Sequence, residues 1–305
     1  MPQLPTAVLG KTGLRVTRLG YGAMEIRGSR IWSGRPVTDD QASTILNAVL
    51  DAGINFIDTA NDYGRSEEFI GKFIGHRRGE FVLATKCGCT VVRKDDQTDD
   101  TPHVWTRENL FRGLEESLAR MKTDFIDIMQ LHNPSVEQVE QGSLVEALRE
   151  MQKQGKVRFI SISTTLPHLP AFLKSGVFAS FQIPYSALER THETWIATAA
   201  QAGIGTIIRG GVARGEPGAG LGSADRWKLF ENARLDELRE PGESRTSFLL
   251  RFTLSHPQID TIIAGTLIPS HLQENMHAAL RGPLPDNVYR EAKSRLAAAG
   301  AKPAE

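Results

Sequence analysis

The chain has 305 residues, in which 36 Lys and Arg balance 36 Asp and Glu. With a formal charge of zero, the chain lacks the net positive charge that attracts nucleic acids and anionic membranes, so we expect neither as a partner. The 40% apolar and 24% charged fractions are typical of a folded globular chain and exclude disordered and fibrous classes. The chain has only two cysteines, which fits a reducing compartment. It shows neither an apolar run of about 18 residues nor a signal-peptide pattern, so we predict a cytoplasmic protein.

The chain begins with a predicted β-hairpin, in which Ala7–Leu9 and Leu14–Thr17 flank the turn Gly10-Lys11-Thr12-Gly13. Eight short, almost uninterrupted apolar runs follow and alternate with stretches of helical period, which is the pattern of βα units around a parallel sheet. The predicted strands are Arg18–Tyr21, Asn55–Asp58, Phe81–Lys86, Phe125–His132, Val157–Ser163, Phe181–Ile183, Gly205–Ile208 and Thr261–Ala264.

Helix start and stop signals lie between these strands. Thr38 and Thr106 each precede a polar first turn and are predicted N-caps. Gly residues that follow helical runs predict C-terminal turns with positive φ, at Gly53, Gly155, Gly176 and Gly203. Further helices are expected at Ser143–Gln154, Leu169–Ser175, Glu193–Ala202, Ser244–Leu254, Ser270–Ala279 and Asn287–Ala299.

Eight strand-helix units in one chain of this length favour a (β/α)8 TIM barrel with an N-terminal β-hairpin. No linker or compositional shift divides the chain, so we expect a single domain with its core at about residues 9–280 and a C-terminal helix at about 286–299. A doubly wound open sheet is the alternative. It would need a glycine-rich fingerprint after its first strand, and Leu19-Gly20-Tyr21-Gly22-Ala23-Met24 does not complete one.

In such a barrel the catalytic side chains stand at the C-terminal ends of the strands. Asp58, Lys86 and His132 each close a predicted strand, and Tyr63 follows five residues after Asp58. A nearby ammonium lowers the pKa of a tyrosine from about 10, and a carboxylate can hold that ammonium in place. Tyr63 would then act as a general acid toward a carbonyl oxygen, while His132 orients that oxygen. An acid with no acyl nucleophile beside it calls for a hydride donor such as nicotinamide.

The segment Asp58-Thr59-Ala60-Asn61-Asp62-Tyr63-Gly64-Arg65-Ser66-Glu67-Glu68 resembles the aldo-keto reductases. The resemblance continues through Lys86 and Gln130-Leu131-His132-Asn133-Pro134 and covers about Leu9 to Ala279. It implies a catalytic tetrad of Asp58, Tyr63, Lys86 and His132. It also implies a barrel that binds NADP(H), or NAD(H), and a small carbonyl or alcohol substrate.

The resemblance also assigns the cofactor site. Ser163 and Gln182 match residues that hold the nicotinamide carboxamide, although Thr164 stands where the family usually has Asn. Arg209 takes the place of the aromatic residue that commonly stacks on nicotinamide, and a guanidinium plane can stack there too. His271 occupies a place where NADPH-preferring members put Lys or Arg near the 2′-phosphate, as does Leu267. The cofactor contacts implied are Met24, Asp58, Ser163, Gln182, Arg209, Gly210, Val212, Arg214, Gly265, Thr266, His271, Glu274 and Asn275.

Long loops at Gly28–Pro36, Gly88–His103 and Arg209–Lys228 are expected to set substrate specificity. Trp32, Trp105 and Trp227 fall in loops assigned to the catalytic face, where each either walls the substrate pocket or only packs its loop.

No metal is expected, because the remaining histidines form no i,i+4 or H-E-x-x-H pair. Cys87 and Cys89 are interpreted as ordinary thiols near the mouth, with a redox-sensitive patch as the alternative.

Two other functions stay open. One is a regulatory or redox-sensing subunit that binds nicotinamide with little turnover. The other is a barrel lyase that uses Lys86 as a Schiff-base nucleophile. Whether the protein is a monomer or a homo-oligomer is left open.

Overall fold

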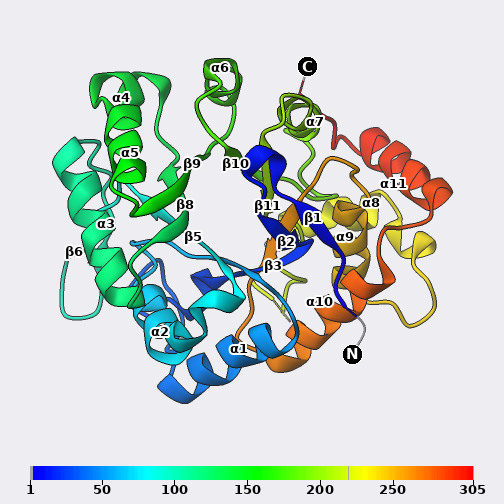
Figure 1. Cartoon of the computed structure of the whole chain (residues 1–305). Helices are drawn as coiled ribbons and strands as arrows, with labels where there is room; N and C mark the ends of the chain where they lie inside the picture. Colours follow the sequence, from blue (N-terminus) through cyan, green and yellow to red (C-terminus); the bar gives the residue numbers. More distant parts are fainter. Residues whose placement is uncertain (1–2, 219, 305) are drawn as a thin grey trace.

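Eight parallel strands close into a barrel in the computed structural model, which describes residues 3–218 and 220–304 (Figure 1). Strands that follow one another in the chain are neighbours around the barrel, and β12 pairs with β3 to close it. The eight predicted strands and the TIM barrel are confirmed, and the open-sheet alternative was wrong. The barrel strands are β3 (Leu19–Gly22), β4 (Phe56–Asp58), β5 (Val82–Cys87), β8 (Ile126–His132), β9 (Val157–Ser163), β10 (Ser180–Pro184), β11 (Gly205–Arg209) and β12 (Thr261–Ala264).

Helices surround the strands in the order expected for βα units (Figure 1). The Thr38 and Thr106 hydroxyls accept hydrogen bonds from backbone N–H groups three residues on, so both predicted N-caps are confirmed. The four predicted C-terminal glycines all have positive φ, between 63° and 79°. The helices are α1 (Asp39–Asp51), α2 (Ser66–Phe73), α3 (Arg107–Met121), α4 (Val136–Gln141), α5 (Leu144–Lys153), α6 (Leu169–Ser175), α7 (Glu193–Gln201), α8 (Ala224–Asn232), α9 (Arg245–Leu254), α10 (Pro269–Arg281) and α11 (Asp286–Ala298).

Three α-helices and one small sheet were not predicted. Helix α2 buries Ser66 and Glu67 on its inner face, which breaks the apolar period that marks a helix. Helix α4 has six residues, too few for a periodic signal, and α8 lies across the end of the predicted loop Arg209–Lys228. The loop after β5 carries the two-residue strands β6 (Val92–Arg93) and β7 (Asp99–Asp100).

The predicted hairpin closes the N-terminal end of the barrel. It consists of β1 (Thr6–Val8), the short helix η1 (Gly10–Thr12) and β2 (Arg15–Thr17). Leu9 and Val16 pack against Phe56, Ile128 and other side chains of the barrel interior. The hairpin thus covers the N-terminal end of the barrel, opposite the strand ends that carry the predicted catalytic residues.

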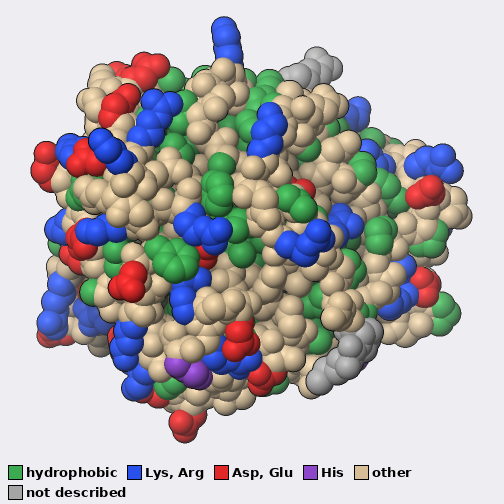
Figure 2. All heavy atoms as spheres, viewed as in Figure 1, with side chains coloured by type: hydrophobic (Ala, Val, Ile, Leu, Met, Phe, Trp, Pro, Cys, Tyr) green, Lys and Arg blue, Asp and Glu red, His purple; other side chains and the backbone are tan. Residues whose placement is uncertain are grey.

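Acidic and basic side chains stand beside one another on the surface, most visibly over α2, α3 and α5 at the left of Figure 2. This arrangement agrees with the zero formal charge. Among the described residues, no helix combines the length and the hydropathy that crossing a membrane requires.

Candidate active site

A buried ion pair lies at the C-terminal ends of β4 and β5. Lys86 Nζ donates hydrogen bonds to Asp58 Oδ2 and to the Thr59 carbonyl oxygen, each at 2.7 Å. Both charged side chains are almost entirely shielded from water, with 0% and 2% exposure. The parallel register of β4 on β5 places Asp58 beside Ala84, so the longer Lys86 side chain reaches it from two residues further along its strand.

Two glutamines hold the other oxygen of Asp58. The Nε2 groups of Gln130, in β8, and Gln182, in β10, each donate to Oδ1 at 2.8 Å. Asp58 therefore accepts from three donors, which fix its orientation and compensate for its burial. Gln182 was predicted to lie in the site. The role of Gln130 was not predicted, because an amide within an apolar strand carries no periodic signal that separates it from the core.

Tyr63 lies over this ion pair, with Lys86 Nζ 4.7 Å from the centre of its ring. Its ring packs edge-on against Trp32 and His132. Burial raises the pKa of Tyr63 above its ordinary value, and the charge of Lys86 opposes this only in part. The predicted net lowering of this pKa was therefore wrong. Tyr63 is protonated at neutral pH, which is the form that a general acid needs.

The surroundings of Lys86 favour the charged ammonium form. Burial acts to lower the pKa of Lys86, but the charges and hydrogen bonds of Asp58 and Tyr63 together raise it overall. The Nζ atom also points at two protein oxygens, and Lys86 does not line the cavity described below. This environment disfavours the Schiff-base alternative, which needs a neutral amine open to substrate.

His132 ends β8, and its ring presents two different nitrogens. Nδ1 lies 3.1 Å from Cys89 Sγ and 3.5 Å from Asp62 Oδ2. Burial acts to raise the pKa of Asp62, but its interactions with His132 and Cys89 lower the pKa overall, so this carboxylate is negative. With Nδ1 directed at these two groups, Nε2 is the nitrogen that can face the cavity.

A cavity of about 890 Å³ opens over these residues, within the size range of small-molecule sites. Three of the four predicted catalytic residues line it, Lys86 being the one behind the wall. All thirteen predicted cofactor contacts line it as well. Lining residues that were not predicted include Arg27, Arg35, Asn133, Ser244 and Thr246.

The residues that depart from the family pattern have different positions. Thr164 and Leu267 do not line the cavity, whereas His271 does. Asn133, which follows His132, lines the cavity with φ of 60° and accepts a hydrogen bond from the Ser163 hydroxyl at 3.1 Å. The chain thus places an amide beside Ser163, although Thr164 follows it in sequence.

The three tryptophans do not behave alike. Trp32 lines the cavity, as one of its two interpretations predicted. Trp105 packs its loop and stacks on His103, with 5.3 Å between the ring centres. Trp227 lies in helix α8 and is 3% exposed, so its predicted loop position was wrong.

The two thiols are both buried but have different neighbours. Cys87 lies in the core, whereas Cys89 contacts His132.

The model of the Aldo/keto reductase family matches residues 18–296. The chain belongs to this family. Among its relatives, oxidoreductase YrpG of Bacillus subtilis is 32% identical, with 88% of this chain and 89% of that protein covered. The L-galactose dehydrogenase of Arabidopsis thaliana is 25% identical, with 91% and 89% covered. The family resemblance expected from the sequence is confirmed, and the protein is an oxidoreductase.

Solved structures agree with this assignment. The holo form of aldo-keto reductase AKR11C1 from Bacillus halodurans superimposes with a TM-score of 0.83 at 26% identity, covering 96% of each chain. The glycerol dehydrogenase AKR11B4 from Gluconobacter oxydans shares the fold, with a TM-score of 0.78 at 24% identity over 99% of this chain and 97% of that one.

Proposed function

We propose that this aldo-keto reductase is an NAD(P)H-dependent carbonyl reductase in which Tyr63 is the general acid. The observation that carries the proposal is the position of Tyr63 beside the buried Asp58–Lys86 pair, at the wall of the cavity. When bound, the reduced nicotinamide supplies a hydride to the carbonyl carbon of the substrate.

The chain's own residues then manage the proton and the charge. The Tyr63 hydroxyl gives its proton to the carbonyl oxygen, and the Lys86 ammonium stabilises the tyrosinate that remains. Asp58 keeps Lys86 in position through its 2.7 Å bond, and His132 presents Nε2 to the same oxygen. In the reverse direction the tyrosinate takes the proton from an alcohol.

The residues that surround the cavity fit a dinucleotide. Gln182 has committed Nε2 to Asp58, which leaves Oε1 to accept from the nicotinamide carboxamide. Ser163 and Asn133 present a hydroxyl and an amide beside it, and Asn133 can supply the contact that Thr164 does not. Arg209 stands where it can stack on the nicotinamide ring.

The phosphates would meet local positive charge. Ser244, the N-cap of α9, and His271, in the first turn of α10, both line the cavity, and helix N-termini attract anions. Arg214 lines it as well. We therefore propose NADP(H) as the cofactor, with His271 near the 2′-phosphate, and NAD(H) as the alternative.

A regulatory subunit with little turnover is the second candidate, because nicotinamide binding alone would use the same cavity. The intact ion pair and the protonated Tyr63 favour an enzyme.

The test is a deuterium-transfer experiment with carbonyl compounds of several classes, namely small sugars, aromatic aldehydes and bulky ketones. The protein is incubated with NADPH or NADH that carries deuterium at C4, and the alcohol product is analysed by mass spectrometry. Deuterium in the product supports a reductase. Cofactor binding without product in any class would favour the regulatory subunit, and borohydride trapping of a substrate adduct on Lys86 would favour the lyase.

The choice of cofactor is tested separately by measuring the affinities for NADPH and NADH. Equal affinity for NADPH and NADH would refute the assigned 2′-phosphate site.

A further inference from the structure

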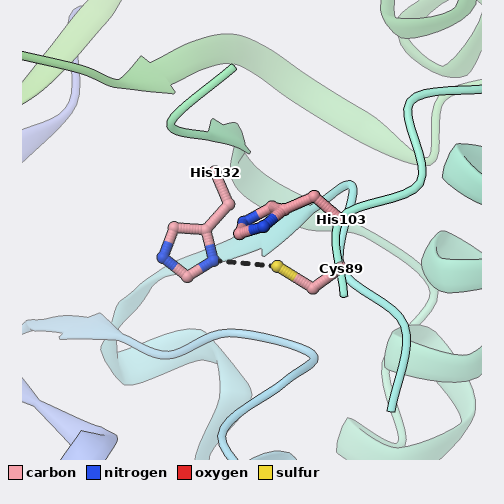
Figure 3. A group of neighbouring side chains, drawn as sticks. All are labelled: Cys89, His103 and His132. Carbon is pink, nitrogen blue, oxygen red and sulfur yellow. Dashed lines mark hydrogen bonds between the residues drawn. The ribbon is translucent and has the colours of Figure 1, made fainter. Parts of the chain in front are cut away.

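Three potential metal-binding side chains meet beside the cavity although they come from three separate segments (Figure 3). Cys89 follows β5, His103 precedes α3, and His132 ends β8. One donor atom from each lies within 4.8 Å of the other two. The closest pair, Cys89 Sγ and His132 Nδ1, is 3.1 Å apart.

Contacts of the surrounding backbone hold these donors in place. Cys89 and His103 face each other in an antiparallel bridge, and hydrogen bonds from Thr90 N to Pro102 O and from Val104 N to Gly88 O flank it. The Cys89 carbonyl also accepts a hydrogen bond from the Asn61 side chain at 3.0 Å. The cluster is thus preorganised, which lowers the cost of binding an ion.

A second observation at the cluster indicates a cation. The Asp62 side chain is 1% exposed, and neither of its oxygens makes a hydrogen bond of good geometry among the described residues; its polar neighbours are His132 and Cys89 themselves. Oδ2 lies 3.5 Å from His132 Nδ1, the same atom that approaches Cys89. A buried carboxylate without hydrogen bonds is costly unless a positive charge lies nearby.

We propose that Cys89, His103 and His132 bind a divalent transition-metal ion of the zinc class, with Asp62 balancing its charge from the second shell of the site. One thiolate and two imidazoles suit zinc, cobalt and similar ions rather than magnesium or calcium. Metal–sulfur and metal–nitrogen bonds of about 2.3 and 2.05 Å at tetrahedral angles put the two donors about 3.6 Å apart. The observed 3.1 Å requires only a small opening of the pair.

Binding exchanges the Cys89 S–H bond for a sulfur–metal bond and releases the proton to solvent. Three protein ligands leave the fourth position to water. Ligation through Nδ1 leaves Nε2 of His132 directed to the cavity, so the site is compatible with the proposed function and does not depend on it. A bound metal ion would join the loop after β5 to the end of β8.

Cobalt spectroscopy of the full chain tests the proposal. The protein is treated with a chelator, kept reduced with a phosphine and titrated with Co²⁺. We expect a thiolate-to-cobalt charge-transfer band that saturates at one ion per chain and disappears when Zn²⁺ is added. The band should vanish in Cys89→Ser and persist in Cys87→Ser, a matched control whose buried thiol contacts the Gln130 carbonyl instead. Absence of the band, or its survival in Cys89→Ser, would overturn the proposal.

His103→Ala provides a variant that leaves the core intact, because the His103 side chain is exposed. We expect it to weaken Co²⁺ binding at least tenfold, whereas unchanged affinity would refute the assigned ligand set. None of these readouts involves nicotinamide, so failure of this proposal would be distinct from failure of the proposed function.

Discussion

Replacing Asp58 with Asn tests whether the buried ion pair organises the site. The new side chain has nearly the same shape, but one of its two ends must be an NH2 group. On one side that group would face Lys86 Nζ, and on the other it would face the Nε2 donors of Gln130 and Gln182. No orientation of the amide restores the three hydrogen bonds that the carboxylate accepts.

The expected cost follows from the burial of the pair. Asp58→Asn leaves the fully buried Lys86 ammonium without its anionic partner, facing only neutral acceptors such as the Thr59 carbonyl oxygen. Removing one member of a buried ion pair destabilises a protein by about 3–5 kcal/mol. We expect a loss of this size in the free energy of unfolding, measured at pH 7 by urea denaturation with tryptophan fluorescence and circular dichroism.

The double variant Asp58→Asn/Lys86→Met is the matched control, since it removes both charges. Its loss should be smaller than the sum of the two single losses by about 1–3 kcal/mol, because no unpaired charge is left buried. It should nevertheless remain inactive. A loss below about 1 kcal/mol in Asp58→Asn, or strictly additive losses in the double variant, would refute the structural role given to the pair.

Three other outcomes are expected. Gly88→Ala and Gly53→Ala should each add about 1–2 kcal/mol of backbone strain at positive φ, but Gly88→Ala should destabilise the protein more, because its new Cβ would lie 1.9 Å from the Trp105 ring whereas Gly53 has open space. Equal losses in thermal melting would contradict this. Burial lowers the pKa of His256, so its contribution to stability is complete above about pH 6.5 and is lost as the pH falls below that value. Between pH 7.5 and 5.5, urea denaturation should show a smaller loss of unfolding free energy in His256→Gln than in wild type. The same loss in both proteins would exclude His256 as a cause. His271→Ala should weaken NADPH binding about tenfold, through loss of a charge-assisted hydrogen bond to the phosphate. A fluorescence titration should show NADH binding unchanged, and equal effects on both cofactors would remove His271 from the 2′-phosphate site.

The positions of Asp58, Lys86 and His132 could be predicted because each ends an apolar run, and parallel strands place their C-terminal ends at one mouth. Tyr63 followed from the spacing of the same motif. The sign of its pKa shift could not be predicted, because it depends on how completely the loops around Trp32 exclude water from the ring.

The spatial grouping of Cys89, His103 and His132 was not predicted from the sequence, and whether it binds a metal is a proposal. Metal sites are recognised in sequence by close, regular spacing of ligands, usually on one helix or hairpin. Here the donors are 14 and 29 residues apart, and the short backbone bridge that joins two of them carries no periodic signal. The prediction that no metal binds relied on spacing alone. Asn133 was overlooked for a related reason, since its contact with Ser163 depends on a left-handed turn at the end of β8.

The measurement that tests the central claim most directly is single-turnover reduction of an aldehyde accepted by wild type, by Tyr63→Phe, with NADPH consumption followed by stopped flow. If Tyr63 gives the proton, the rate should fall by about 10²- to 10⁴-fold, while NADPH binding, followed by quenching of protein fluorescence, stays unchanged. A variant that retains turnover within tenfold of wild type would contradict the role of Tyr63 as the general acid.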